Sequence, residues 1–270
     1  MEVYEQPPHP YLKTFINRYL YVDADKEEMP QVKIIPTGFS YLTRVYGNSE
    51  CADDEGNRHQ LPDIFLGGQV TRQKLCVYPN DRFCHFGIEF KPAGIHKLFH
   101  IPMDETLNGF ADIADLVTSE AYAAFNQVFS ESIGFEEQCI RLDKFFLQKE
   151  KEAVKCPKID QLIELLNQEK SDISIEEAAS KVYLSARQLR RKFKTICSIS
   201  PHAYRNIMQM NQIYELIDEG EHARLQDLAY KCGYFDVAHF INSFKQRMGE
   251  NPSAFLESDE SFINTYIKHT

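Results

Sequence analysis

Residues 173–204 read ISIEEAASKVYLSARQLRRKFKTICSISPHAY, and residues 225–255 read LQDLAYKCGYFDVAHFINSFKQRMGENPSAF. The second stretch repeats the first, at a spacing of 50 residues up to the turn and 51 after it. The matching pairs are Ala179 with Ala229, Val182 with Cys232, Leu184 with Tyr234, Leu189 with Phe240, Phe193 with Phe244, Pro201 with Pro252 and Tyr204 with Phe255. An internal repeat is stronger evidence of architecture than a single motif. It predicts two copies of one small helical unit.

Each copy has the residue pattern of a helix-turn-helix. A small side chain lets two helix axes approach closely. We therefore expect the two helices of each copy to cross at Ala179 and at Ala229. Gly233 suits the positive φ that the turn often requires. Apolar residues at helical spacing, such as Leu189 and Phe240, anchor the second helix and leave its other side free. The pattern predicts helices over 174–182, 186–196, 225–232 and 237–248.

The free side of the second helix in the first copy is strongly basic. No Asp or Glu occurs between residues 182 and 214, and five cationic residues lie within 187–194. Guanidinium groups bind guanine O6 and N7 or phosphates, and glutamine can read adenine. A merely solvated helix face usually mixes charges of both signs in pairs one turn apart. We therefore predict that this helix enters the DNA major groove, with contacts from Arg187, Gln188, Arg190, Arg191 and Lys194.

The second copy presents fewer groups that bind DNA. Among its outward residues, His239 and Asn242 can bond to base edges, whereas Val237 and Ala238 can touch a thymine methyl group. Lys245 on the same helix completes the predicted interface. We therefore predict asymmetric reading, in which the first copy supplies most of the affinity and the second supplies shape and an A·T preference.

Helix N-termini are further candidates for phosphate contacts, because their free N–H groups attract anions. Ser185, His202 in the turn at 200–202, and the turn at 251–253 occupy such positions. Plain helix capping is the alternative interpretation of these residues. Asp236 is interpreted as a cap rather than as a base reader.

Residues 156–257 resemble the DNA-binding domain of the AraC/XylS family of bacterial transcription regulators. The resemblance rests on the two quoted stretches, and above all on Ala229, Gly233, Phe240, Phe244-Lys245, Gly249 and Pro252. It implies two helix-turn-helix subdomains joined by one long helix, here 201–218, with recognition helices in successive major grooves about 34 Å apart. A helix of 18 residues is roughly 27 Å long, which is a suitable spacer.

Three residues depart from the family pattern. Tyr183 stands where many members have the turn glycine, so a strained or altered first turn is expected. Gln209 replaces a usual arginine of the linker helix, and Ile213 replaces a usual alanine. These two put one electrostatic anchor and the packing around it in doubt, but not the fold.

The first half of the chain has the pattern of short β-strands. Residues 81–91 alternate, with Cys84, Phe86, Ile88 and Phe90 on one face, which predicts a half-buried strand. Further strands are expected over 32–35, 41–46, 64–66 and 70–78, which favours a small β-barrel or sandwich. Helices are expected over 119–130 and 136–150. The motifs at 34–38 (IIPTG) and 86–94 (FGIEFKPAG) resemble an uncharacterised N-terminal domain found on some of these regulators.

The expected fold class is therefore α+β. Residues 1–155 form a sensor or oligomerisation domain, residues 156–257 an all-α domain of about seven helices, and residues 258–270 a tail. The net charge of −10 resides mainly in the first of these, which has 16 Lys and Arg against 24 Asp and Glu. A local basic stripe outweighs this total near DNA, because salt screens charges beyond about 10 Å.

Composition and motif content argue against a membrane-spanning, an exported, a disulfide-rich or a metal-binding protein. No apolar run reaches the roughly 18 residues that a membrane span needs, and MEVYEQPPHP does not resemble an export signal, so a cytoplasmic location without membrane contact is expected. Seven cysteines without a C-x-x-C pair argue against disulfides and zinc. His96 and His100 share a helix face but lack a third metal ligand, so no metal and no cofactor are predicted. The aromatic and basic residues Tyr41, Arg44, Tyr46 and Arg72 line an anion cavity or, more ordinarily, belong to the core.

Three functions remain open for the first half: binding a small effector, mediating protein contacts alone, or carrying an enzyme. No G-x-S-x-G, Walker A, G-x-G-x-x-G or H-E-x-x-H motif occurs, so the protein is not expected to be an enzyme. We predict a sequence-specific regulator of transcription, an activator, whose partners are double-stranded DNA, a small-molecule effector, RNA polymerase and a second copy of the chain.

Overall fold

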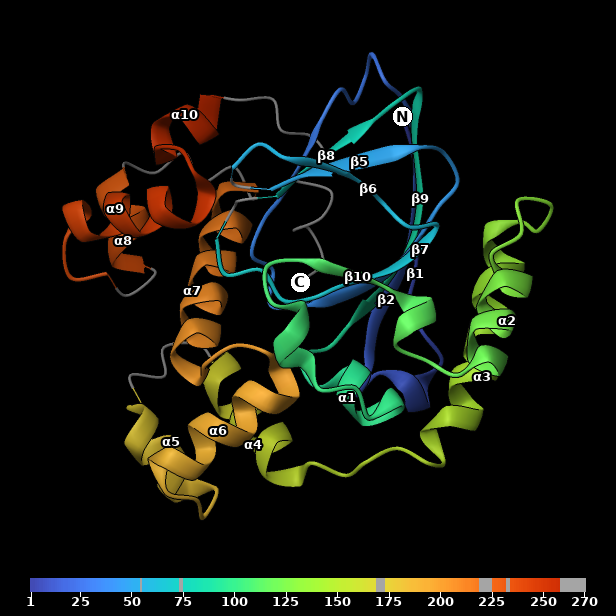
Figure 1. Cartoon of the computed structure of the whole chain (residues 1–270). Helices are drawn as coiled ribbons and strands as arrows, with labels where there is room; N and C mark the ends of the chain where they lie inside the picture. The colour runs from blue at the N-terminus through green and yellow to red at the C-terminus, as the bar shows by residue number, and fades with distance from the viewer. Residues whose placement is uncertain (54, 73–74, 169–172, 219–224, 232–233, 258–270) are drawn as a thin grey trace.

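The computed structural model describes residues 1–270 apart from 54, 73–74, 169–172, 219–224, 232–233 and 258–270 (Figure 1). Its N-terminal half combines two β-sheets with helices, and its C-terminal part consists of helices. The predicted α+β class is confirmed. Cys232, Gly233 and the predicted tail at 258–270 lie outside the described residues.

Two antiparallel sheets form a sandwich. The larger has the order β1-β2-β9-β4-β7-β10 and the smaller β3-β8-β5-β6, and no pairing within the described part of the chain closes either sheet. The structure is therefore the sandwich rather than the barrel. The strands are β1 (Glu2–Gln6), β2 (Ile16–Asp25), β3 (Val32–Ile34), β4 (Ser40–Val45), β5 (Ser49–Ala52), β6 (Arg58–Gln60), β7 (Ile64–Gly67), β8 (Leu75–Pro79), β9 (Arg82–Phe90) and β10 (Phe110–Asp112).

The predicted strand at 81–91 is present as β9, but the prediction that it is half-buried is wrong. Every residue from Phe83 to Phe90 is buried. Phe86 and Phe90 pack in the main core, which includes helix side chains, whereas Phe83 and His85 face the smaller sheet across a narrow pocket. The second face can be buried because the carboxylate of Glu89 accepts hydrogen bonds from Asn17, Arg18 and Tyr41 at 2.6, 3.3 and 2.8 Å, respectively.

Helices close one side of the sandwich. They are α1 (Gly94–Phe99), α2 (Ser119–Val128) and α3 (Phe135–Glu150), with short 3-10 turns η1 (Pro10–Leu12), η2 (Met103–Thr106) and η3 (Ile113–Asp115). The two helices predicted at 119–130 and 136–150 are thus confirmed, and they lie side by side at the edge of the molecule (Figure 1). Phe125 of α2 and Phe146 of α3 enter the core with a ring separation of 6.3 Å.

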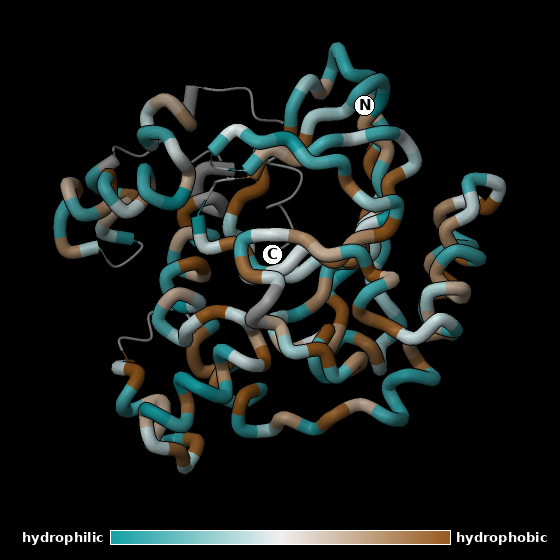
Figure 2. Tube along the Cα trace, viewed as in Figure 1, coloured by the Kyte–Doolittle hydropathy of each residue, from teal (hydrophilic) through white to brown (hydrophobic). Residues whose placement is uncertain are grey.

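The C-terminal part has the expected seven helices within the described residues. They are α4 (Pro157–Asn167), α5 (Ile175–Lys181), α6 (Ala186–Cys197), α7 (Pro201–Asp218), α8 (Leu225–Lys231), α9 (Val237–Met248) and α10 (Pro252–Glu257). Hydrophobic residues recur along them between hydrophilic ones, as amphipathic helices require (Figure 2). None of the helices in the described ranges is long and apolar enough to cross a membrane.

The long helix α7 connects two separate cores. Its first half contributes Tyr204 and Ile207 to a core with α4, α5 and α6, and its second half contributes Met210 and Ile213 to a core with α8, α9 and α10. The helix therefore joins the two helix-turn-helix units as the repeat implied.

The N-terminal half contacts both units. Near the first, the buried ammonium of Lys97 bonds both carboxylate oxygens of Asp160, at 3.1 and 3.2 Å. Near the second, Lys33 pairs with Glu250 at 2.8 Å. Between them, the Asn211 amide on α7 donates to the carbonyl of Thr37 at 2.9 Å. The two parts of the chain are thus held together by polar contacts, some of them buried, as well as by packing.

Candidate nucleic-acid interface

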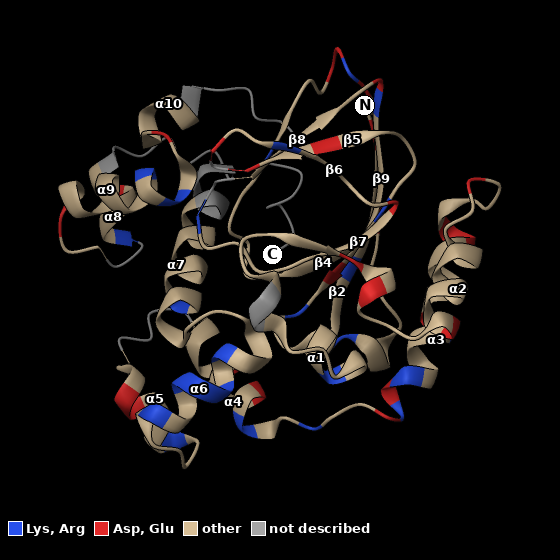
Figure 3. Cartoon of the chain, in the orientation of Figure 1, with Lys and Arg blue, Asp and Glu red and all other residues tan. Residues whose placement is uncertain are grey.

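The second helix of the first unit, α6, presents an exposed cationic face. Leu189 and Phe193 point inward and are fully buried, whereas Arg187, Arg191 and Lys194 are exposed. Within the described part of the chain these three cations have no hydrogen bond or ion pair, and Figure 3 shows basic residues gathered on α6. The face is available to a large anion.

Arg190 is held differently from its neighbours. Its guanidinium pairs with Glu176 at the start of α5, at 2.6 Å, with both side chains more than half exposed. The sequence interval without acidic residues did not reveal this partner, because Glu176 precedes the interval. Exposed pairs of this kind are weak, so DNA can compete with Glu176 for the guanidinium.

The start of α6 is fixed by a reciprocal cap between Ser185 and Gln188. The Ser185 hydroxyl accepts from the backbone N–H of Gln188 at 3.3 Å, and the Gln188 side-chain oxygen accepts from the N–H of Ser185 at 3.0 Å. The capping alternative for Ser185 is therefore present in the structure. The cap occupies the amide oxygen with which Gln188 would accept a bond from adenine.

The turn before α6 is strained, as the family comparison led us to expect. Tyr183 has a φ of +54°, although a non-glycine residue there costs about 1–2 kcal/mol. Its ring is 87% exposed and adds no packing. The turn is closed by the N–H of Leu184, which donates to the carbonyl of Ala179 at 3.0 Å.

The second unit has the same construction with a different surface. The Asp236 carboxylate accepts from the N–H of His239 at 2.7 Å, which confirms its interpretation as a helix cap. Ala238, His239, Asn242 and Lys245 are exposed. Val237 is partly buried and packs on the core of this unit, so little of it is presented outward.

The start of α7 is also capped and carries an exposed histidine. The Ser200 hydroxyl accepts from the N–H of Ala203 at 3.1 Å. Asn206 lies 3.1 Å from Nδ1 of His202. Partial burial, and then the nearby Arg205 and Arg247, lower the pKa of His202, which favours the neutral form of its ring.

Two cationic residues near this face were not selected from the sequence. Arg205 bonds the carbonyl of Ile173 at 3.0 Å and faces a groove that also contains Arg190 and His202. Arg247, at the end of α9, lies near His202. Arg205 had a signal, since it belongs to the basic interval after residue 182, whereas Arg247 required the fold.

The described residues do not assemble the other sites that the sequence raised. No group of three potential metal ligands occurs within the described ranges. His96 instead contacts the Ile101 carbonyl at 2.9 Å. Tyr41 bonds Glu89, Arg44 pairs with Asp63 at 3.6 Å, and Arg72 lies beside α7, so these described side chains do not line one anion cavity, which was the less favoured of their two interpretations. The six described cysteines are free thiols.

Two of the cavities that the described residues form border the sheets or the boundary with the C-terminal helices. A narrow one of about 90 Å³ lies between the two sheets; its walls are mainly apolar, with polar groups from Thr37, Tyr41, Thr43 and His85. Burial lowers the pKa of His85 to about 3, so this pocket is lined by a neutral imidazole.

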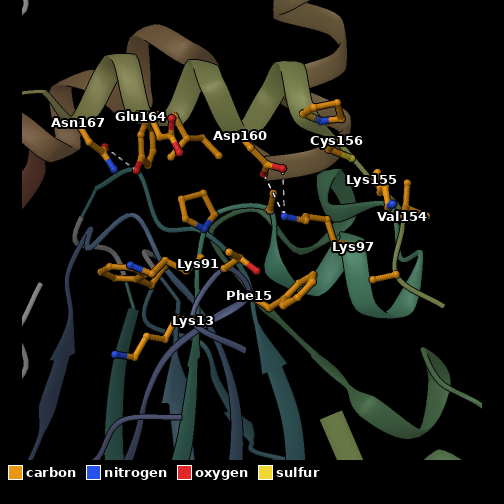
Figure 4. Close-up of a pocket in the computed structure, with 18 of the residues that line it drawn as sticks. Lys13, Phe15, Lys91, Lys97, Val154, Lys155, Cys156, Asp160, Glu164 and Asn167 are labelled. Carbon is orange, nitrogen blue, oxygen red and sulfur yellow. Dashed lines mark hydrogen bonds and ion pairs between the residues drawn. The ribbon is translucent and has the colours of Figure 1, made fainter. Parts of the chain in front are cut away.

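The larger cavity, of about 870 Å³, lies between α4, α7 and the N-terminal half (Figure 4). Its lining includes the basic residues Lys13 and Lys91 and the acidic residues Glu150 and Glu164. Lys97 and Asp160, which also line it, form an ion pair. Burial lowers the pKa of Lys91, which lines this space. The charges of both signs do not define one class of ligand.

Comparison with known families agrees with the geometry. Residues 178–258 match a family described as a helix-turn-helix domain, and residues 4–112 match a domain of unknown function, DUF6597. The chain carries an AraC-type helix-turn-helix domain. Both N-terminal motifs named from the sequence, at 34–38 and 86–94, fall within the second match.

Curated relatives of this AraC-type chain include the HTH-type transcriptional activator RhaS from two Escherichia coli strains. RhaS of strain O139:H28 is 24% identical over 152 residues, covering 56% of this chain and 54% of that protein. RhaS of O1:K1 is 26% identical over 92 residues, or 34% and 33% of the two chains. The chain thus spans about half, or less, of the length of these relatives.

A solved structure extends the likeness to the fold of the whole chain. Apo ToxT K231A from Vibrio cholerae strain SCE256 superposes with a TM-score of 0.51 over 93% of this chain and 99% of its own, at 12% identity. At that identity the likeness shows a shared fold.

Proposed function

We propose that this AraC-type protein is a sequence-specific, double-stranded-DNA-binding regulator of transcription. The observation that carries the proposal is the face of α6, where Arg187, Arg191 and Lys194 are exposed, cationic and without partners among the described residues. Neighbouring positive charges repel one another, and a bound anion relieves that repulsion. The surface is also complementary to the phosphates and to the guanine edges of a major groove.

The two units divide the work. Residues of α6 supply phosphate contacts and guanine reading, and Arg190 joins them when DNA displaces Glu176. On α9, His239 and Asn242 bond to base edges, Ala238 with the exposed part of Val237 touches thymine methyl groups, and Lys245 binds phosphate. Because Gln188 and Ser185 cap α6, they position this helix. His202 contacts the DNA phosphate backbone between the two major grooves.

We infer that residues 1–155 sense a small molecule and that residues 156–257 bind DNA. The pocket between the sheets supports an effector over a purely protein-binding role, because its lining is mainly apolar with a few polar groups; its volume of about 90 Å³ limits the effector to a very small molecule. Thr37 lines this pocket and its carbonyl also bonds Asn211 on α7. Ligand in the pocket therefore acts on the segment that holds the linker helix.

The outer face of α3 supports the same choice. Apart from Ile140, its exposed positions are polar, and Glu137 and Arg141 form an ion pair at 2.7 Å. A flat apolar face would have favoured a role in protein contacts alone. RNA polymerase remains the expected protein partner, since relatives are named transcriptional activators, and a homodimer and a cytoplasmic location complete the proposal.

Selection of bound duplexes from genomic or random DNA, at stated salt, tests the proposal directly. We expect one enriched sequence, bound with an affinity that falls steeply as salt rises. Arg191→Ala should weaken binding by about tenfold and reduce the salt slope by about one. Arg141→Ala on α3 removes the same charge far from the interface and should change neither. Absence of an enriched sequence, or equal effects of the two variants, contradicts the proposal.

A further inference from the structure

A polar groove of about 310 Å³ lies where the two helix-turn-helix units meet the N-terminal half, and we call it the junction groove. Three parts of the chain line it: Arg72 from the loop after β7, His202 and Asn206 from the start of α7, and Gln246 and Arg247 from the end of α9. Among the described residues no carboxylate lines it. Two guanidinium groups thus share one concave site without an acidic residue.

Several N–H donors in this groove have no acceptor among the described residues. Arg72 makes no hydrogen bond or ion pair with any described residue. Among the described residues, Arg247 bonds only the carbonyl oxygen and the hydroxyl of Ser243 on its own helix, through Nη1. When the Asn206 amide donates to Nδ1 of His202, the neutral ring carries its proton on Nε2 and keeps it free to donate.

The loop that carries Arg72 is held in place from within the N-terminal half. Both the N–H and the hydroxyl of Thr71 donate to the side-chain oxygen of Asn108, at 2.8 and 3.0 Å. Asn108 itself sits at a φ of +55° and donates its N–H to the Gln69 carbonyl at 2.9 Å. The residue before Arg72 is therefore anchored twice, which reduces the entropy that Arg72 loses when it binds a ligand.

We propose that the junction groove binds a phosphate group. Arginine offers paired N–H donors that match phosphate oxygens, and an anion between Arg72 and Arg247 is attracted to both guanidinium groups. A neutral His202 adds a third donor without requiring a proton. The ligand is a phosphate ester or a free phosphate, and the structure indicates which source to expect.

The position of the groove points to the DNA backbone, an assignment that rests on the proposed function. His202 also lines a second groove, of about 380 Å³, together with Arg190 of α6 and Arg205 of α7. Basic residues therefore continue from α6, past the start of α7, to the end of α9. Recognition helices in successive major grooves leave one stretch of backbone between them. That backbone is where the junction groove places Arg72, so the N-terminal half itself contacts DNA.

Two variants of the full chain test the assignment against the selected duplex. Arg72→Ala should lower the affinity about tenfold and reduce the salt slope by about one. Arg141→Ala, with the same charge change on α3, is the matched control. The same proteins are then titrated with inorganic phosphate while thermal unfolding is followed, because a ligand of the folded state raises its stability.

The two assays distinguish a phosphate of the DNA backbone from free phosphate. Loss of DNA affinity and of salt slope in Arg72→Ala alone supports a backbone phosphate. Loss of the phosphate-induced thermal shift, with DNA binding unchanged, supports a free phosphate instead. If Arg72→Ala matches Arg141→Ala in both assays, the phosphate site is overturned. Failure of the proposed function is recognised independently, because Arg191→Ala would then also leave DNA binding intact.

Discussion

The two helix-turn-helix units share an interior and differ at their surfaces. In each, a backbone bond closes the turn: Leu184 to Ala179 at 3.0 Å and Tyr234 to Ala229 at 2.9 Å. The two second helices are anchored by fully buried side chains, Phe193 in one and Phe244 in the other. Position by position, however, the outward residues Arg187, Gln188 and Arg191 of α6 correspond to Ala238, His239 and Asn242 of α9.

This difference shows which positions the fold constrains. Packing fixes the interior, so the repeat is visible there despite the separation of the copies. The outward positions contribute little to stability and are free to differ. One scaffold therefore presents a strongly cationic face on α6 and a less charged face on α9.

The largest expected effect tests the shared interior. Phe193→Ala and Phe244→Ala each remove a fully buried ring, which should destabilise the affected unit by about 3–5 kcal/mol. Hydrogen exchange should show lost protection in α5 and α6 for the first variant and in α8 and α9 for the second, because the cores are separate. Loss of protection across both units in either variant would show that they do not behave as two copies.

The next effect tests the difference between the surfaces. The double variant Arg187→Ala/Arg191→Ala should weaken binding of the selected duplex by about 100-fold and reduce the salt slope by about two. His239→Ala/Asn242→Ala should cost about tenfold and leave the slope unchanged, because neutral donors release no counterions. Fluorescence anisotropy at four salt concentrations measures both quantities. Equal losses and equal slopes would contradict the asymmetry.

The units also differ in how firmly the N-terminal half holds them. Asp160→Asn leaves the nearly buried ammonium of Lys97 without its counterion, and should cost about 2 kcal/mol. Glu250→Gln breaks a more exposed pair with Lys33 and should cost less than about 1 kcal/mol. Chemical unfolding of the two variants side by side measures the difference. A larger loss in Glu250→Gln would mean that the second unit is the more tightly held.

The sequence predicted the helical part far better than the sandwich. Helical periodicity and caps are local signals, and the five C-terminal helices whose bounds were predicted agree with α5 to α9 to within a few residues. The strand predicted at 70–78 is shorter, and β1, β2, β5, β6 and β10 were missed. Strand β2 is buried on both faces and so lacks a clear alternation, whereas β5, β6 and β10 have only three or four residues.

In the candidate interface, too, local features could be predicted from the sequence and tertiary contacts could not. Exposure of Arg187, Arg191 and Lys194 followed from the repeat alone. The cap between Ser185 and Gln188 was readable, because serine followed three residues later by glutamine is a capping box. The pairing of Arg190 with Glu176 and the meeting of Arg72 with Arg247 depend on tertiary placement, which no local pattern contains.

The smallest effect concerns the two turns. Tyr183→Asn should stabilise the first unit by up to about 1 kcal/mol, because asparagine tolerates the positive φ better than tyrosine does and the exposed ring loses no contacts. Asparagine is preferred to glycine for this test, since glycine would also increase the entropy of the unfolded chain.

Phe235→Asn is the matched control in the second turn, because Phe235 is 90% exposed and has no positive φ. Its effect on stability should stay within about 0.5 kcal/mol. Thermal unfolding of both variants compares the turns directly. If the two substitutions shift the midpoint equally, exposure of an aromatic ring explains the result and backbone strain does not. A gain confined to Tyr183→Asn would instead locate the strain at the one turn whose glycine has been replaced.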